Sequence, residues 1–123
     1  MRGIIKVVNF WVVMDSGFSV RPRHLIAEAE GSIIYGLGHV LREEITIKGG
    51  HVQQSNFTDY EPLRIAETPE IKVEVISSQS AGEVADLVTA ASVGNAFLPT
   101  TSLRLRDLPM SPNRVKAALQ GRS

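Results

Sequence analysis

In the pair Gly82-Glu83, a residue with a carboxylate side chain directly follows a glycine, whose backbone is conformationally free. The pair precedes a stretch rich in Ala, Ser and Val that predicts a helix over residues 84–97. In the first turn of a helix, unpaired backbone N–H groups and the positive end of the dipole favour an ionised carboxylate. Such a carboxylate can act as a general base, yet a glutamate here also stabilises a helix without any catalytic role. The local pattern leaves both roles open.

Composition excludes several other kinds of site. The chain has no cysteine, which excludes disulfides, thiolate zinc sites and cysteine-bound iron–sulfur clusters. Electrons from any redox reaction would therefore have to pass through another chain. None of His24, His39 and His51 has partners at the spacing of a zinc site. Thirteen basic residues balance 13 acidic ones, so no net charge attracts nucleic acid or an anionic membrane.

The N-terminal residues resemble a secretion signal only in part. Arg2 precedes an apolar run, but Lys6 and Asn9 interrupt that run and no small-residue cleavage site follows. No stretch is long and apolar enough to span a bilayer. We therefore expect no signal peptide and no membrane span, with a cytoplasmic location as the default expectation.

The elements that must position Glu83 begin with a run of β-branched and aromatic residues. Residues 4–13 predict a strand buried on both faces. Residues 24–42 place apolar and small side chains at helical spacing, after a proline at position 22 that suits a helix start. Gly31, Gly36 and Gly38 each weaken this helix by about 1 kcal/mol relative to alanine. We therefore expect another part of the chain to pack closely against the helix backbone.

The remaining elements follow from turn residues and alternation. Residues 44–48 and 51–55 flank Gly49-Gly50, which predicts a β-hairpin with a tight turn. Residues 71–76 alternate apolar and charged side chains as a half-buried strand. Pro99 should end the second helix, and Ser111 should cap a third helix that extends to Leu119. Together these elements predict an α/β (α+β) fold, with two or three helices on a small mixed sheet that includes the hairpin.

Five short motifs follow one another between residues 32 and 76. They are a glycine-rich helix, EITI at 44–47, QSNF-x-DY at 54–60, LR-x-x-E-x-P at 63–69, and the alternating strand. In this order they resemble the β chains of isoquinoline-oxidoreductase-type molybdenum hydroxylases. More broadly they resemble the C-terminal part of the molybdopterin-binding large subunit in the xanthine dehydrogenase and aldehyde oxidase superfamily. NAF at 95–97 and LRDLP at 105–109 are similar to the family's ending, so the resemblance covers nearly the whole chain.

This resemblance implies a set of site residues. In the family a glycine-rich loop ends in a Gly-Glu pair, and its glutamate is the general base beside molybdenum. Counting back from residues 95–97 assigns that role to Glu83, with Ala81, Gly82 and Val84 beside the cofactor. Glu28 stands where the family has a cofactor-side glutamine, which makes it a further cofactor-binding candidate. The implied reaction is hydroxylation of an N-heteroaromatic carbon or an aldehyde, with water as the oxygen source.

The resemblance also implies the cofactor, the partners and the domain division. The cofactor would be molybdenum–pyranopterin (molybdopterin), which we expect in its dinucleotide form. The partners would be the remainder of the large molybdenum subunit and an iron–sulfur subunit, and the family also includes periplasmic enzymes. Residues 1–110 would form part of the second molybdopterin-binding subdomain, and residues 111–123 a C-terminal helical tail. We expect the chain by itself to be inactive.

Some residues depart from the family pattern. The loop at residues 77–81 is shorter than the family loop and lacks its adjacent glycines. Val84 stands where the family has a proline. The charge of Glu28 would be unfavourable beside an anionic pterin, so a solvent-facing helix position is its alternative. We interpret Asn56, Asp59 and Tyr60 as structural first, because a polar loop needs turn hydrogen bonds. These departures support an alternative hypothesis, a non-catalytic truncated remnant that acts as a small interaction or assembly module.

Overall fold

The computed structural model describes residues 3–76 and 88–121 of the chain. At its centre is a two-stranded parallel sheet, in which β1 (Asn9–Asp15) pairs with β4 (Glu70–Ile76). The register runs from Asn9 opposite Glu70 to Asp15 opposite Ile76, so the two strands end side by side. Both strands contain the β-branched residues that suit a packed, extended backbone.

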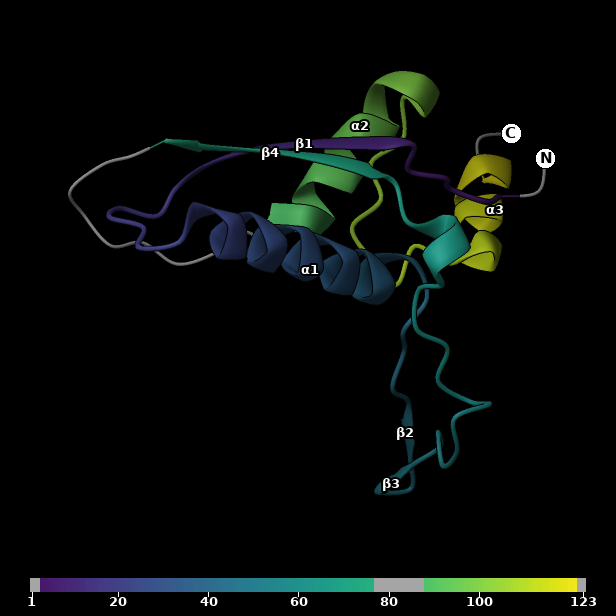
Figure 1. Cartoon of the computed structure of the whole chain (residues 1–123). Helices are drawn as coiled ribbons and strands as arrows, with labels where there is room; N and C mark the ends of the chain where they lie inside the picture. Colours follow the sequence, from purple (N-terminus) through teal and green to yellow (C-terminus); the bar gives the residue numbers. More distant parts are fainter. Residues whose placement is uncertain (1–2, 77–87, 122–123) are drawn as a thin grey trace.

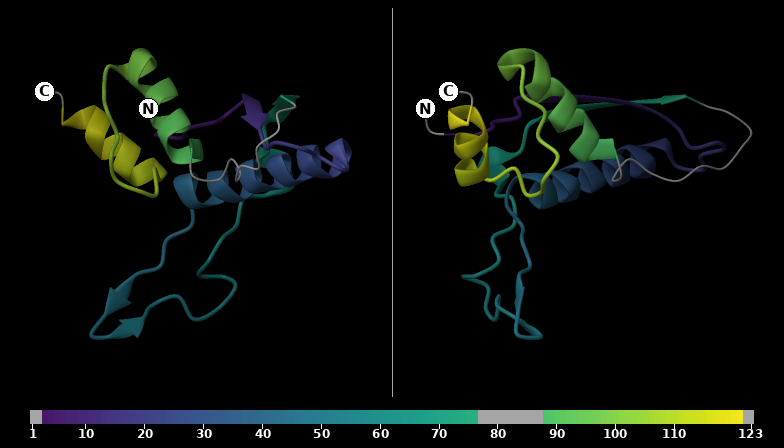
Figure 2. Two further views of the ribbon diagram at one scale, coloured as in Figure 1. Left: turned by 90° about the vertical axis from the view of Figure 1, so that its left-hand side faces the viewer. Right: turned by 180° about the vertical axis from the view of Figure 1, so that it is seen from behind.

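Parallel strands need a long connection, and here the connection holds a helix and a projecting arm. α1 (Pro22–Leu41) has a proline in its first turn, as predicted, and runs back along the sheet against β4 (Figure 1). The arm, residues 43–67, contains β2 (Ile47–Lys48), β3 (His51–Val52) and the short helix η1 (Ile65–Glu67). Both views in Figure 2 show the hairpin end of the arm far from the helices.

Two further helices follow the sheet. α2 (Thr89–Thr101) packs against α1, and α3 (Pro112–Gln120) lies near the amino ends of the strands (Figure 1). Gly3 contacts α3 so closely that a Cβ at Gly3 would overlap the Pro112 carbonyl oxygen. The three helices, the parallel pair and the hairpin confirm the predicted α/β (α+β) class.

One hydrophobic core joins these elements. It lies between the inner face of the sheet, α1, α2 and α3, and α1 contributes the most residues to it. Its buried members are Phe10, Ile33, Leu37, Val40, Val93, Met110 and Val115. Val115 belongs to the same core as α1, so the segment after residue 110 packs onto the rest of the chain.

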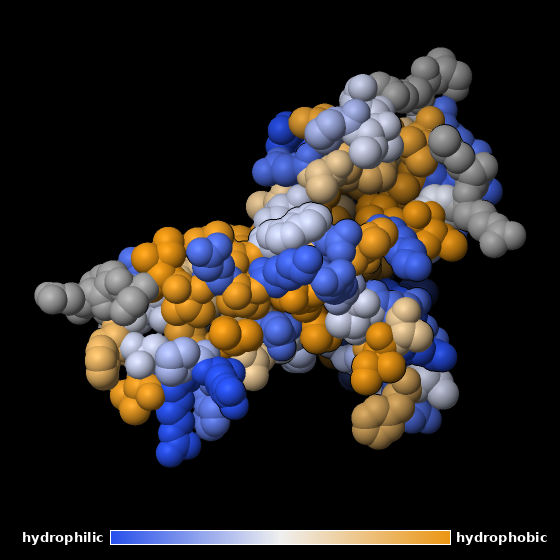
Figure 3. All heavy atoms as spheres, turned by 45° about the horizontal axis from the view of Figure 1, so that its top comes forward, coloured by the Kyte–Doolittle hydropathy of each residue, from blue (hydrophilic) through white to orange (hydrophobic). Residues whose placement is uncertain are grey.

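The prediction that the first strand is buried on both faces is wrong. Phe10 points into the core and is 8% exposed, whereas Trp11 and Val13 on the other face are 67% and 63% exposed. The reason is that helices cover only one face of the sheet. Apolar surface is consequently broad on the side of the molecule shown in Figure 3.

The hairpin is confirmed, with shorter strands than predicted. Gly49 and Gly50 form its turn with φ of 59° and 80°, values that glycine adopts readily. The strands cover only Ile47–Lys48 and His51–Val52. A two-stranded ribbon without a packing partner is marginal, and both strands here are exposed, which explains the shortened pairing.

The ends of the later helices differ from the prediction in three ways. α2 starts after its predicted start at residue 84, and no side chain caps it. Pro99 lies within α2, which continues for two residues after it, and the Thr100 and Thr101 hydroxyls donate to the Phe97 carbonyl, each at 2.8 Å. Ser111 is the N-cap residue of α3 as predicted, but its side chain makes no capping hydrogen bond.

A buried carboxylate attaches the arm to α1. The side chain of Glu43 is only 5% exposed, accepts a hydrogen bond from the Tyr60 hydroxyl, and lies 3.3 Å from Nε2 of His39. A Cβ at Gly38 would overlap the Glu43 carboxylate, so the close approach expected at the glycines is confirmed there. At Gly31 that expectation is wrong, because nothing lies within 4 Å of a Cβ built on it.

Ion pairs hold the base of the arm. Arg42 bridges the two sides of the arm, with Nη1 3.2 Å from Oε2 of Glu61 and Nη2 paired with Glu67. Arg114 of α3 pairs with Glu44 on the outgoing side. Partly exposed pairs of this kind each contribute about 0–1 kcal/mol, so they position the arm more than they stabilise the fold.

The two helix glycines give a matched pair of stability predictions. Gly31→Ala should raise the free energy of unfolding by about 1 kcal/mol, since alanine is the better helix former and the site is open. Gly38→Ala should lower it despite the same intrinsic gain, because the methyl group displaces Glu43 from Tyr60 and His39. Urea unfolding of both variants checks this. Equal shifts of the same sign would contradict the packing described for Gly38.

The arm attachment predicts an alkaline transition. The hydrogen bond to the Glu43 carboxylate raises the pKa of Tyr60 from 10 to about 12. Because the pKa of Tyr60 is higher in the folded than in the unfolded protein, its hydrogen bond stabilises the fold fully below pH 10. That contribution is lost as the pH rises from 10 towards 12. In a spectrophotometric phenolate titration, Tyr60→Phe should remove the transition near pH 12, and Tyr35→Phe should keep it. A wild-type titration without that transition would refute the attachment.

Candidate functional site

The carboxyl ends of β1 and β4 form the natural position for a ligand. The two strands are parallel, and Asp15 lies opposite Ile76, so both strands end at the same edge of the sheet (Figure 1). In open α/β sheets, ligands bind in the crevice outside the carboxyl ends of the strands. We refer to this position as the carboxyl edge.

A tight turn shapes the described half of the carboxyl edge. The N–H of Gly17 donates to Oδ1 of Asp15 at 3.1 Å, and Gly17 is buried with φ of 78°. A residue with a side chain would be strained at this angle. The turn thus holds the chain close to the strand end before α1 begins.

Two buried hydroxyl groups have no hydrogen-bond partner among the described residues. They are Oγ of Ser16, directly after β1, and Oγ1 of Thr89, at the start of α2. Thr89 is fully buried. A buried, unpaired hydroxyl costs about 1–3 kcal/mol, which makes both groups candidates for contact with a bound polar group.

The candidate site residues of the family motif lie outside the described residues. Ala81, Gly82, Glu83 and Val84 all belong to residues 77–87, which connect β4 to α2. The predicted position of Glu83 in the first turn of a helix therefore lies outside the described residues, among which α2 begins at Thr89. The small and apolar residues of this stretch predicted a helix, but no capping residue indicated where the helix starts.

Glu28 lies elsewhere. It is exposed on α1 and lines neither of the two pockets described below. This position fits the solvent-facing alternative for Glu28, while its cofactor-binding role stays a prediction.

Metal ligands do not gather in the part of the chain that the structure describes. No cluster of three His, Asp or Glu side chains within residues 3–76 and 88–121 could hold a metal ion. His39 instead contacts Glu43 and stacks edge-on with Tyr35 at a ring distance of 4.6 Å. Within those residues, no helix has both the length and the apolar character to cross a membrane.

The polar loop of the arm has the structural role that we predicted. Asp59 accepts hydrogen bonds from the Ser55 N–H at 3.1 Å and from the Ser55 hydroxyl at 3.4 Å. The Ser55 N–H is the main reason that the pKa of the Asp59 carboxyl lies below its usual value. Asn56 accepts from the N–H of Phe57 at 2.8 Å. These bonds close the turn.

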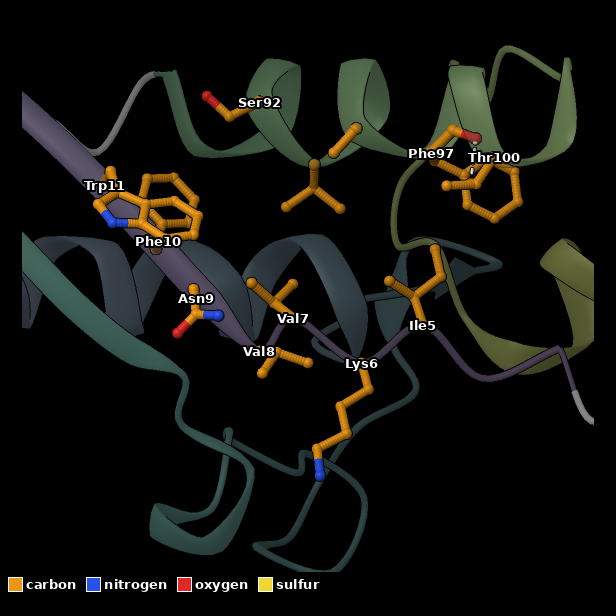
Figure 4. Close-up of a pocket in the computed structure, with 12 residues that line it drawn as sticks. Ile5, Lys6, Val7, Val8, Asn9, Phe10, Trp11, Ser92, Phe97 and Thr100 are labelled. Carbon is orange, nitrogen blue, oxygen red and sulfur yellow. Dashed lines mark hydrogen bonds between the residues drawn. The ribbon is translucent and has the colours of Figure 1, made fainter.

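Two pockets adjoin the N-terminal segment. The first, which we name the edge groove, has a volume of about 450 Å³ and lies between residues 5–11 and α2 (Figure 4). Its wall on α2 consists of Ser92, Val93, Ala96, Phe97 and Thr100. The second, of about 700 Å³, lies between residues 4–7, the base of the arm and the start of α3. Neither pocket includes the turn at Asp15 to Gly17.

Sequence reasoning missed three of these features. Ser16 and Thr89 carry common hydroxyl side chains, and nothing in their spacing indicates that they are buried without partners. The attachment of Tyr60 to Glu43 joins residues far apart in the sequence, and its one local signal was the glycine at position 38. The edge groove arises only when α2 is placed beside β1.

Comparisons with known proteins agree on one family. The sequence model of the molybdopterin cofactor-binding domain matches residues 1–69. The beta chain of isoquinoline 1-oxidoreductase from Brevundimonas diminuta is 35% identical over 88% of this chain and 14% of its own length. A chain of nicotinate dehydrogenase from Pseudomonas putida is 30% identical over 97% of this chain and 10% of its own length.

A third relative is named for a different cofactor. The membrane-bound aldehyde dehydrogenase (pyrroloquinoline-quinone) of Gluconacetobacter polyoxogenes is 34% identical over 96% of this chain and 16% of its own length. The chain thus spans about a sixth or less of the length of these relatives.

Solved structures confirm the fold. Quinoline 2-oxidoreductase from Pseudomonas putida 86 matches with a TM-score of 0.83 at 21% identity, over 96% of this chain and 17% of the other. The Cu,Mo-CO dehydrogenase matches with a TM-score of 0.74 at 18% identity, over 98% of this chain and 17% of the other. The chain therefore belongs to the molybdopterin cofactor-binding domain family, within the molybdenum hydroxylase large subunits of the xanthine dehydrogenase and aldehyde oxidase superfamily.

Proposed function

We propose that this chain is the part of a molybdenum hydroxylase large subunit that contributes the glutamate base, and that it acts in assembly with the remainder of that subunit. The observation that carries the proposal is the position of Gly82-Glu83 in the chain. The pair follows β4 in a chain whose residues 1–69 match the family domain, and the parallel strands of this chain end at the carboxyl edge, where ligands of such sheets bind.

The described residues suit a polar cofactor at this edge. The hydroxyls of Ser16 and Thr89 are buried and unpaired among the described residues, and Ser16 directly follows β1 at the carboxyl edge. A hydroxyl can donate to a phosphate or pterin oxygen and can also accept a hydrogen bond. A bound molybdopterin would therefore satisfy groups that the described residues leave unpaired. We propose the dinucleotide form, whose second phosphate offers additional acceptors.

Each residue of the motif has a proposed role. Glu83 would take up the proton released as water-derived oxygen is transferred to the substrate carbon, which is the task of a general base. Ala81, Gly82 and Val84 would approach the cofactor, since a glycine permits close contact with backbone N–H groups. When bound, the molybdenum cofactor supplies the redox centre that accepts the substrate electrons.

The proposed substrates follow the relatives. The names of three of the matched proteins refer to isoquinoline, nicotinate and an aldehyde. We propose an N-heteroaromatic compound or an aldehyde as the substrate of the assembled enzyme. Electrons would leave through an iron–sulfur subunit, because this chain has no cysteine to ligate a cluster.

The proposed domain division keeps residues 1–110 as the molybdopterin-binding subdomain. Residues 111–123 would form the C-terminal helical tail, attached through Val115. The competing hypothesis of a non-catalytic assembly module predicts the same fold, so the two must be separated by cofactor content and turnover.

Purification from the native source tests the assembly. The expected eluate contains this chain, a much larger partner chain and about one molybdenum per complex, measured by elemental mass spectrometry. Iron in the same eluate would indicate the proposed iron–sulfur subunit. A chain that purifies alone and without metal would contradict the proposal and support the assembly-module hypothesis.

Glu83→Gln tests the base within that complex. The amide cannot accept the proton, so kcat should fall by about 100-fold to 10,000-fold while the molybdenum content stays unchanged. Glu74→Gln is the matched control, because Glu74 lies on the outward face of β4 and its loss should leave kcat unchanged. If Glu83→Gln retains full turnover in a loaded complex, Glu83 is not the base.

A further inference from the structure

The outer edge of β1 is open. β1 and β4 form a two-stranded sheet, so among the described residues each strand has a partner on one side only. The N–H of Glu70 donates to the carbonyl of Val8 at 3.0 Å. Backbone groups of successive residues alternate between the two sides of a strand, so Val8 and every second residue after it face β4. The backbone groups of Asn9, Trp11 and Val13 consequently point away from β4. They form a row of donors and acceptors that an additional strand can pair with.

The outward face of the sheet is divided between the two strands. On β4 this face carries Glu70, Lys72 and Glu74, and Nζ of Lys72 lies 3.4 Å from Oε1 of Glu70. These charged side chains are stable in water. On β1 the same face carries Trp11 and Val13, which are mostly exposed. Covering β1 would bury apolar area, whereas covering β4 would desolvate charges.

The edge groove extends the apolar surface next to that open edge. Residues 5–11 line it, and they comprise the start of β1 and the extended segment that leads into it. Figure 4 shows Trp11, Val7 and Ile5 along the N-terminal segment, with Phe97 of α2 at the end of the groove where Ile5 lies. About 450 Å³ provides room for several apolar side chains of a strand that pairs with β1.

We infer that the open edge of β1 and the edge groove bind a β-strand from another part of the large subunit. The inference rests on the proposed function. The relatives are about six or more times longer than the segment matched here, so most of their residues lie outside it. The bound strand would donate to and accept from Asn9, Trp11 and Val13, and would insert alternate apolar side chains into the edge groove. A second copy of this chain is the competing occupant.

Hydrogen exchange in a reconstituted complex tests the inference. The probe is the beta chain of isoquinoline 1-oxidoreductase from Brevundimonas diminuta without the stretch that this chain matches, coexpressed as a separate chain. The full 123-residue chain should copurify with it. The amides of Asn9, Trp11 and Val13 should then exchange at least tenfold more slowly than in the chain alone, while those on the arm hairpin keep their rates.

Two variants and one control locate the contact. Val13→Pro removes an outward N–H but no bond of the β1–β4 ladder, and should lower the recovered complex at least tenfold. Val13→Thr keeps the N–H and the β-branched shape, and should recover as much complex as wild type. Ala96→Arg places a charge in the edge groove from an exposed position on α2 and should also prevent assembly. It keeps the test valid if Val13→Pro fails to fold.

The outcomes separate this inference from the proposed function. A complex that contains molybdenum but whose edge amides exchange at the free rate overturns the inference alone. A metal-free complex with protected edge amides overturns the proposed function alone. Absence of any complex contradicts both. If the isolated chain has the mass of a dimer, its edge amides are protected and Val13→Pro makes it monomeric, a second copy occupies the edge and the inference is wrong.

Discussion

The parallel pairing of β1 with β4 is the constraint on which the rest of the structure depends. Parallel strands cannot be joined by a short turn, so α1 and the arm both occur within the connection. The pairing also brings two chain segments to one edge, although they are far apart in sequence. The position of the candidate site and the length of the connection therefore both follow from the parallel direction of the two strands.

The arm is supported at its base and not along its length. Glu43 lies between α1 and Tyr60, and Gly38 provides the space for its carboxylate. Beyond that point the hairpin has no core of its own, and Phe57 is almost fully exposed. Local turn chemistry determines the shape of the arm's end, whereas one buried polar cluster determines its direction.

Much of the fold could be predicted from the sequence, because its elements follow local rules. Helical spacing, paired glycines and strict alternation predicted α1, the hairpin and β4. The burial of β1 could not be predicted, since a run of apolar residues does not reveal how many faces other elements cover. For the site, family motifs predict Glu83, which lies outside the described residues, but spacing gave no indication that Ser16 and Thr89 are buried without partners among the described residues.

The contact between Gly3 and Pro112 has a consequence for anything attached to the chain. It holds the N-terminal segment against α3, at the end of the sheet opposite the carboxyl edge (Figure 1). β1 alone spans roughly 20 Å at about 3.3 Å per residue. A fluorophore or affinity tag joined before Gly3 would therefore begin at the opposite end of β1 from the carboxyl edge.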